Sequence, residues 1–221
     1  MTGYAGHVTS GGPSAVRELD TLTIRKCSVG ALDNNAYLLT CRSTGAQLLI
    51  DAADDLPRLQ TLVAEGGERL DTILTTHQHW DHVRALRGLA EWSGAATAAG
   101  ADDADALPLA PTRRLEHGDV IDVGAARLEV VQLRGHTPGS VALAYRDPAG
   151  HAHLFSGDSL FPGGVGNTSN PGQSFESLYA DVLARVFEVY DDATWVYPGH
   201  GDDTTLGAER PHLDEWRERG W

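Results

Sequence analysis

Cysteine, basic clusters and long apolar segments are scarce in this 221-residue chain. Cys27 and Cys41 are its two cysteines, too few for a disulfide scaffold, so we expect free buried thiols, with a hairpin disulfide as the alternative. The 17 Lys and Arg residues form no run and face 31 Asp and Glu, which argues against a nucleic-acid partner. No segment approaches the roughly 20 apolar residues of a membrane span, and the N-terminus has no signal-peptide pattern. These absences predict a cytoplasmic protein that binds neither nucleic acid nor a membrane.

The length of the chain and its local composition predict one folded unit. At 221 residues it fits a single domain with a real apolar core. Residues 1–20 are rich in Gly, Ser, Thr and Pro, which is typical of a loosely held segment, and order is expected to begin near Leu22. We therefore predict a flexible N-terminal arm over residues 1–20 and a single domain over residues 21–221.

The pattern of apolar and turn-forming residues predicts an α/β fold. The first strands are expected to form an antiparallel meander, and helices are expected where apolar residues recur every three or four positions. The predicted strands are 21–27, 36–41, 46–50, 70–75, 119–123, 127–133, 141–145, 153–155 and 195–197, and the predicted helices are 56–66, 83–92, 175–189 and 211–219. Residues 94–118 show no clear pattern beyond a short helix or loop near residues 101–106. The elements fall into two comparable halves.

The stretch THQHWDH, residues 76–82, follows a predicted strand and is dense in metal-binding side chains. It places His77, His79, Asp81 and His82 within six positions. Such crowding leaves imidazoles and a carboxylate in conflict unless a cation lies among them. Mixed nitrogen and carboxylate ligands favour zinc or non-haem iron over calcium or magnesium.

Three further turns each hold one residue of the same kind at the end of a predicted strand. They are GHTPG (135–139), FSGDS (155–159) and YPGHG (197–201), which contribute His136, Asp158 and His200. Together with the first stretch they supply more ligands than one tetrahedral metal can use, so two metals are expected. We predict that His77, His79 and His136 form one site, that Asp81, His82 and His200 form the other, and that Asp158 bridges them.

Other polar residues are candidates for supporting roles. Asp51 ends a predicted strand and could either cap the next segment or support a metal ligand. The Gly-rich segment 161–168 is expected to overhang the site, either as a flexible connector or as a substrate-contacting loop. The candidate substrate contacts are Asn167, Thr168 and Ser169, and the histidines expected to be exposed or structural are His7, His117, His151, His153 and His212.

The ordered motifs between about residues 22 and 201 resemble the metallo-β-lactamase superfamily, and most of all its glyoxalase II type hydrolases. The resemblance implies a four-layer αββα sandwich with the metal site at one edge between the sheets. It also favours metal-site support as the role of Asp51. Asp158 stands where many true β-lactamases carry cysteine or serine, which argues against an antibiotic-degrading role. Glyoxalase II proper continues into a helical domain that helps to bind glutathione, whereas 21 residues (221 minus 200) follow His200 here.

From these features we predict a dinuclear metal-dependent hydrolase with a small-molecule substrate. Attack by metal-bound hydroxide, oriented by Asp81, would cleave a small acyl thioester of a low-molecular-weight thiol. A thiol other than glutathione, such as mycothiol or bacillithiol, is the expected carrier. Zinc is the expected metal and iron the alternative. The rival hypotheses are a lactonase or carboxylic-ester hydrolase on the same site, a mono-iron persulfide dioxygenase, and a non-catalytic protein that keeps the fold. The oligomeric state is not predicted.

Overall fold

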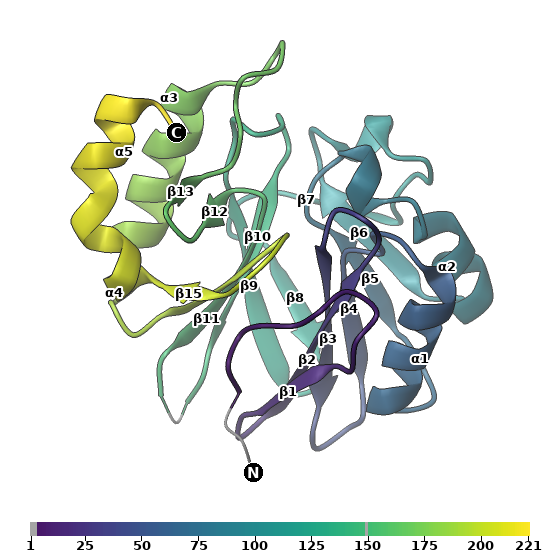
Figure 1. The fold of residues 1–221 in the computed structure, drawn as a ribbon. Helices are drawn as coiled ribbons and strands as arrows, with labels where there is room; N and C mark the ends of the chain where they lie inside the picture. Colours follow the sequence, from purple (N-terminus) through teal and green to yellow (C-terminus); the bar gives the residue numbers. More distant parts are fainter. Residues whose placement is uncertain (1–3, 149) are drawn as a thin grey trace.

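Two β-sheets pack face to face and carry helices on both outer faces (Figure 1). The computed structural model describes residues 4–148 and 150–221. The first sheet consists, in order, of β1 (Ala15–Glu18), β2 (Leu22–Val29), β3 (Asn34–Cys41), β4 (Gln47–Ile50), β5 (Thr72–Thr75), β6 (Ala96–Gly100) and β7 (Arg113–Leu115). The second consists of β15 (Thr204–Thr205), β14 (Trp195–Pro198), β11 (Ala152–Gly157), β10 (Val141–Arg146), β9 (Ala126–Gln132) and β8 (Val120–Val123). A separate hairpin joins β12 (Leu160–Phe161) to β13 (Gly164–Val165).

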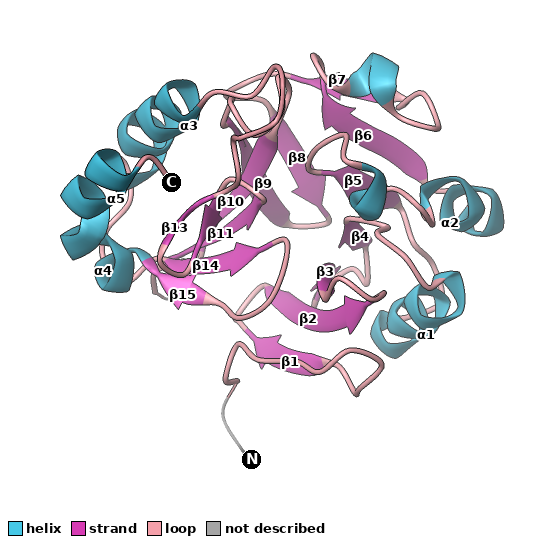
Figure 2. Cartoon of the chain, turned by 45° about the horizontal axis from the view of Figure 1, so that its top comes forward, coloured by secondary structure: helices cyan, strands magenta, loops and turns pink. Residues whose placement is uncertain are grey.

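The helices lie outside the two sheets and complete four layers (Figure 2). α1 (Leu56–Gly66) and α2 (Leu86–Ser93) cover the first sheet. The second sheet is covered by α3 (Phe175–Val182), which continues as a π-helical turn over Leu183–Phe187, and by α4 (Leu206–Glu209) and α5 (Leu213–Arg219). The predicted α/β fold and αββα sandwich are therefore confirmed. No helix among the described residues is long and apolar enough to cross a membrane.

Three apolar clusters fill the three interfaces between these layers. The cluster between the sheets includes Leu39 and Leu128, one from each sheet. The cluster under α1 and α2 includes Leu62, and the cluster under α3 and α5 includes Leu178 and Trp216, all almost fully buried. Because each sheet is covered on both faces, inner strands such as β4 and β10 read as apolar runs, whereas the edge strands β1 and β8 alternate between more and less buried residues.

Strand direction decides which loops meet at one edge. β4, β5 and β6 are parallel, with α1 and α2 as the crossovers, so the segments that follow these strands emerge side by side. In the second sheet β11 and β14 are parallel, and β9 runs the same way because β10 is antiparallel to both β9 and β11. The segments after six strands, three in each sheet, therefore emerge at one edge of the sandwich, where a site is expected.

Several element boundaries differ from those predicted. β1 pairs with β2, so the first sheet begins at Ala15 and not near Leu22; the division of the chain into residues 1–20 and 21–221 stays a prediction. β6 and β7 lie in the segment 94–118, where Ala-rich composition hides β6 and the three residues Arg-Arg-Leu are too few to mark β7. A short helical turn at Ala104–Ala106 agrees with expectation. The helix after THQHWDH begins at Leu86 because Trp80–His82 form a separate 3-10 turn. The two cysteines are free and buried, as predicted.

Candidate metal centre

Four loops at this edge bring the seven predicted ligand side chains together. The loop after β5 carries His77, His79, Asp81 and His82, and the loops after β9, β11 and β14 carry His136, Asp158 and His200. The ring centroid of His77 lies 4.2 Å from that of His82 and 4.9 Å from that of His136. Residues that are more than 120 positions apart in sequence thus form one cluster, and sheet topology alone brings them into contact.

The first ligand group consists of His77, His79 and His136. One nitrogen from each lies within 4.8 Å of the others. His136 Nδ1 is hydrogen-bonded to the backbone oxygen of Asn167 at 2.7 Å, which fixes the ring so that Nε2 turns to the cluster. Burial, reinforced by neighbouring histidines, lowers the pKa of His77 well below its usual value, so its ring is held neutral and able to bind a cation.

The second group consists of Asp81, His82 and His200, which also offer atoms within 4.8 Å of one another. The Nε2 atoms of His82 and His200 are 3.1 Å apart, and His200 Nε2 lies 3.4 Å from Asp81 Oδ2. His200 Nδ1 is hydrogen-bonded to the backbone oxygen of Leu32 at 2.8 Å. Asn34 Nδ2 donates a hydrogen bond to Asp81 Oδ2 at 3.0 Å. His200 is thereby oriented by a backbone oxygen on the side away from the cluster, and the carboxylate of Asp81 by an amide beside the cluster.

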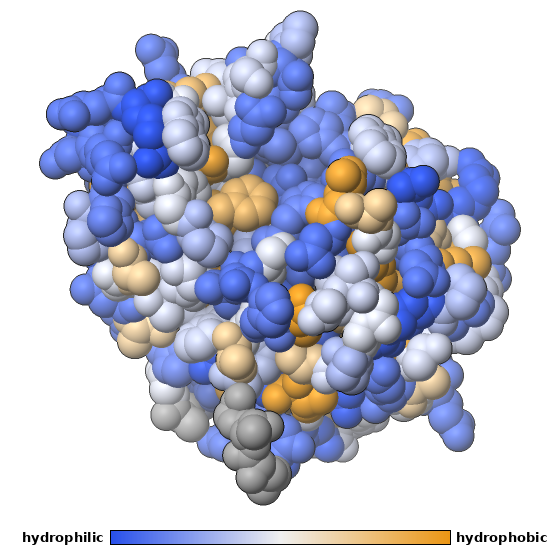
Figure 3. Space-filling model, viewed as in Figure 1, coloured by the Kyte–Doolittle hydropathy of each residue, from blue (hydrophilic) through white to orange (hydrophobic). Residues whose placement is uncertain are grey.

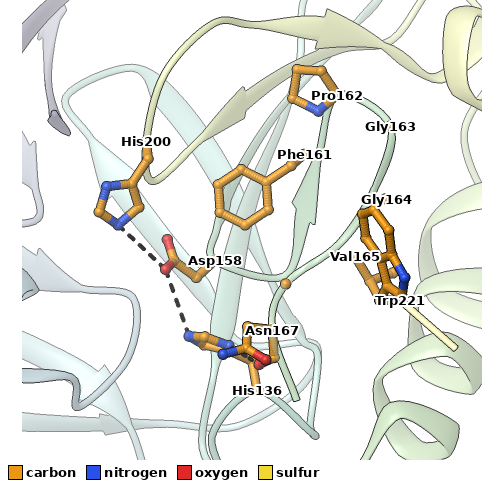
Figure 4. Close-up of a pocket in the computed structure, with 11 residues that line it drawn as sticks. His136, Asp158, Phe161, Pro162, Gly163, Gly164, Val165, Asn167, His200 and Trp221 are labelled. Atoms are coloured by element: carbon orange, nitrogen blue, oxygen red, sulfur yellow. Dashed lines mark hydrogen bonds and ion pairs between the residues drawn. The ribbon is translucent and has the colours of Figure 1, made fainter. Parts of the chain in front are cut away.

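Asp158 lies between the two groups (Figure 4). Its Oδ2 is 3.6 Å from His136 Nε2, on the first group, and 3.4 Å from His200 Nε2, on the second. Its Oδ1 is 3.4 Å from His82 Nε2. This is the position that the bridging role proposed from the sequence requires.

The buried polar atoms of the cluster fit divalent cations. His77 Nε2, His136 Nε2 and Asp158 Oδ1 are buried and have no hydrogen-bond partner among the described residues. Unpaired buried atoms of this kind are rare unless an ion or water satisfies them. Burial lowers the pKa of His200, but Asp158 and Asp81 outweigh it and raise that pKa to about 10. The carboxylates that favour a proton on His200 also favour a metal ion in its place. The donor set of histidine nitrogens and carboxylate oxygens suits divalent metals.

Asp51 supports the first loop from the adjacent strand end. Its carboxylate accepts hydrogen bonds from Thr76 N at 2.7 Å and from Thr76 Oγ1 at 2.8 Å, and it is hydrogen-bonded to His82 Nδ1 at 3.0 Å. The contact holds His82 with Nε2 towards the cluster. The residue is buried, with a backbone φ of 60°, so its carboxylate turns towards the loop rather than capping α1. Asp55 caps α1 instead by accepting from Arg58 N.

Asp103, which the sequence did not single out, ties two ligand loops together. Its buried carboxylate accepts hydrogen bonds from Gln78 N at 2.9 Å, from Thr137 Oγ1 at 2.6 Å and from Gly139 N at 2.6 Å. Gln78 separates His77 from His79, and Thr137 follows His136. Burial raises the pKa of Asp103. The available signal was an acidic residue shortly after a strand, but that strand, β6, was not recognised.

The loop that carries His200 is held by residues from the first sheet. Asn35 Nδ2 donates to the backbone oxygens of Pro198 and Gly201, both at 2.9 Å, and Lys26 Nζ donates to Gly201 O at 2.7 Å. Gly199 allows the backbone to approach the cluster, because a Cβ there would lie 2.1 Å from Asp158 Oδ1. Asn34 and Asn35 follow Asp33 in a run of turn-forming residue types, and this turn propensity masks their role at the site.

A pocket of about 390 Å³ opens beside the His200 side of the cluster. Asn167 lines it, whereas Ser169 turns back and donates through both N and Oγ to Asn167 Oδ1. A substrate-contacting role for Asn167, Thr168 and Ser169 stays a prediction. Trp80 is 61% exposed and lies against the Arg84 guanidinium.

The cluster and its loops coincide with the region that known proteins match. The family model described as the metallo-beta-lactamase superfamily matches residues 29–200, which is most of the chain. The chain belongs to the metallo-beta-lactamase superfamily. The matched range includes each of the seven superfamily-type ligands, from His77 to His200.

Three known proteins are similar to this chain in sequence or structure. The hydroxyacylglutathione hydrolase of Jannaschia sp. (strain CCS1) is 40% identical over 148 residues, which are 66% of this chain and 56% of that protein. The chain thus spans little more than half the length of that relative. TTHA1623, solved in a di-iron-bound form, is 36% identical, with a TM-score of 0.70 over 83% of this chain and 95% of that one. ETHE1 from Myxococcus xanthus is 27% identical, with a TM-score of 0.76 over 86% of this chain and 82% of that one.

Proposed function

We propose that the chain is a dinuclear metal-dependent hydrolase that cleaves a thioester of a low-molecular-weight thiol. The observation that carries the proposal is Asp158, whose carboxylate lies within 4.0 Å of nitrogen atoms from both ligand groups. A single tetrahedral ion would leave part of this donor set unused. The 40% identity to a hydroxyacylglutathione hydrolase supports a thioester as the substrate. Zinc is the proposed metal, and the di-iron form of TTHA1623 makes iron the alternative.

The residues of the chain would orient the reacting groups. Two bound divalent ions would lower the pKa of a water from about 15.7 towards about 7 and polarise the scissile carbonyl. Asp81 is proposed to orient that water, and the bond from Asn34 fixes the rotation of its carboxylate. Asp51 and the backbone oxygen of Leu32 hold His82 and His200 in the orientations that binding requires.

The surroundings of the cluster favour a thiol over an alcohol as leaving group. Among the described residues, neither the pocket beside His200 nor the smaller one beside His79 and Gln173 is lined by Tyr, Lys or Cys. Their histidines, His79, His136 and His200, belong to the two ligand groups. A thiolate, with a pKa of about 8.5 for its conjugate acid, leaves without a proton donor, whereas an alkoxide needs one. This chemistry supports a thioester ahead of a lactone or carboxylic ester.

Metal content and turnover of Asp158→Ala test the proposal. The wild-type protein should hold about two metal ions per chain, and the variant should lose about one of them. Thioester turnover should fall by about 100-fold or more, because even outer partners of metal ligands cost roughly 10- to 100-fold when removed. Asp122→Ala, which removes a carboxylate that is 67% exposed on β8, is the matched control and should change neither quantity. Full metal content and turnover in Asp158→Ala would refute the dinuclear assignment.

Parallel measurements separate the rival functions. A panel of thioesters and lactones distinguishes a thioesterase from a lactonase, since the preferred leaving group sets the larger kcat/KM. One iron per chain together with sulfur-dependent oxygen uptake would favour the dioxygenase. Metal-free protein of normal stability would favour a non-catalytic role.

A further inference from the structure

The pocket beside the cluster has an apolar wall built from two separate parts of the chain. Phe161 and Val165 come from the strands of the β12–β13 hairpin, and Pro162 comes from the turn between them. Trp221 follows the C-terminal end of α5. These side chains surround the cavity while His136, Asp158 and His200 lie at its base (Figure 4). The Phe161 ring centroid is 6.4 Å from that of His200. Figure 3 shows apolar surface within this hollow, over the hairpin.

The wall is held in place by specific contacts. Arg219 donates a hydrogen bond to the backbone oxygen of Gly163, and its guanidinium lies 3.7 Å from the centre of the Trp221 ring. Gly163 N in turn donates to Glu209 Oε2 at 2.8 Å. Val165 is 6% exposed. The hairpin is thus fastened to α4 and α5, and the pocket is a formed feature of the fold.

The pocket offers no counter-charge to an anionic substrate group. None of the residues that line it is Lys or Arg. Arg219 stands behind the wall, where its donors are taken by Gly163 O, by Glu215 Oε1 and by the backbone oxygen of Trp221. At the base, Asp158, His136 and His200 belong to the metal cluster. A carboxylate moved into this pocket away from the metal cluster would lose hydration without gaining a partner.

A second pocket, on the far side of His136, has a more polar lining than the first and likewise contains no Lys or Arg among its described residues. It measures about 170 Å³ and is lined by Gln78, His79, His136, Thr137, Pro138, Asn170, Pro171, Gly172 and Gln173. Both polar atoms of the Gln173 amide already form hydrogen bonds, because Nε2 donates to His136 O and Oε1 accepts from Asn170 N. The cluster therefore lies between a larger apolar pocket and a smaller neutral polar one.

We propose that this arrangement selects thioesters that pair an apolar acyl group with an uncharged thiol carrier. The acyl group contacts Phe161 and Trp221, and the carrier occupies the neutral polar pocket. Hydrolysis adds water to the acyl carbon and breaks the carbon–sulfur bond, releasing a carboxylate, a thiol and a proton. Glutathione, with its two carboxylates, is a poor carrier for this site. The inference rests on the proposed thioesterase function and specifies its substrate class.

A series of acyl thioesters on a neutral carrier, N-acetylcysteamine, tests this selectivity with the metal-loaded protein. Burying one methylene is worth roughly fourfold in an equilibrium constant, so kcat/KM should rise at least about tenfold from the acetyl to the hexanoyl thioester. The hexanoyl thioester of N-acetylcysteamine should exceed that of glutathione by about tenfold or more. A flat response to chain length, or a preference for the glutathione thioester, would overturn the inference.

Two variants test whether the pocket wall causes the dependence of kcat/KM on acyl chain length. Phe161→Ala and Trp221→Ala should each lower the ratio of hexanoyl to acetyl kcat/KM by about threefold to tenfold while metal content stays at the wild-type value. Trp221 is 58% exposed, so its removal leaves the core intact. Trp92→Ala, at a tryptophan that is 51% exposed on α2, is the matched control and should leave the ratio unchanged. An unchanged ratio in both wall variants would exclude the pocket as its source.

Binding of non-hydrolysable ketone analogues of the same chain lengths separates this inference from the proposed function. If no thioester is cleaved but longer ketones still bind more tightly in titration calorimetry, the thioesterase proposal is wrong and the apolar pocket stands. If thioesters are cleaved and neither kcat/KM nor ketone affinity depends on chain length, the thioesterase proposal stands and the selectivity is wrong.

Discussion

Thr137 Oγ1 donates a 2.6 Å hydrogen bond to Asp103 Oδ2, and the same oxygen accepts from Gln78 N. This carboxylate oxygen therefore joins the loop after β9 to the loop after β5. The distance between His136 and the pair His77 and His79 depends on that junction.

Replacing Asp103 should weaken both the fold and the first ligand group. Asp103→Ala leaves Gln78 N, Thr137 Oγ1 and Gly139 N without their acceptor, which should cost about 3 kcal/mol of unfolding free energy. Metal affinity should fall about 10- to 100-fold, as measured by competition with a chelator. The control is Asp102→Ala at the exposed neighbouring position. Loss of stability with unchanged metal affinity would restrict Asp103 to a structural role.

Asp51→Asn should weaken metal binding more than it weakens the fold. The amide keeps the size of the side chain but supplies one acceptor oxygen, while Thr76 N, Thr76 Oγ1 and His82 Nδ1 use both oxygens of the carboxylate. We expect a metal affinity about 10- to 100-fold lower. Metal titration of the purified variant measures it, and wild-type affinity would show that the carboxylate does not orient His82.

Gly199→Ala should displace Asp158. The added Cβ would lie 2.1 Å from Asp158 Oδ1, closer than unbonded atoms approach, so the carboxylate or the loop must move. The variant should lose about one metal per chain, like Asp158→Ala. Gly150→Ala, where a Cβ meets no atom within 4 Å, is the control. Two metals per chain in Gly199→Ala would contradict the expected displacement.

Asp181 binds Arg134, in the segment that precedes His136, and its ionisation should make the stability of the fold depend on pH. Burial raises the pKa of Asp181, but the side chain and backbone N–H of Arg134 outweigh it and hold that pKa below its usual value. A carboxylate whose pKa is lower in the folded state stabilises the fold above about pH 4, and this contribution is lost as the pH falls through the folded-state pKa.

Asp181→Asn should therefore cost about 1 to 2 kcal/mol at pH 7, with a difference from wild type that shrinks below about pH 4. Urea unfolding of both proteins across this pH range measures the difference. A difference that stays constant with pH would show that the charge of Asp181 contributes nothing.

The chain order of the motifs determined much about this protein. Local rules are enough to recognise a dense His and Asp stretch after an apolar strand and Gly-rich turns with one ligand each. The α/β class and the ligand candidates could therefore be predicted, and the sandwich followed from the resemblance to a known family. The same rules failed for β6 and β7, because an Ala-rich strand and a strand of three residues, Arg-Arg-Leu, have weak intrinsic preference and form only where neighbouring strands pair with them.

Contacts between distant residues were decided by the tertiary structure alone. Asp103 and Asn34 reach the centre because parallel pairing sets the ends of β4, β5 and β6 side by side and the start of β3 beside them. The wall of the pocket joins Phe161 to Trp221, 60 positions later, through the packing of α5. The sequence determined which side chains could hold metal. Sheet order and helix packing determined the distances between these side chains and the residues that cover them. Both depend on contacts between segments that bury one another, and no single segment specifies them.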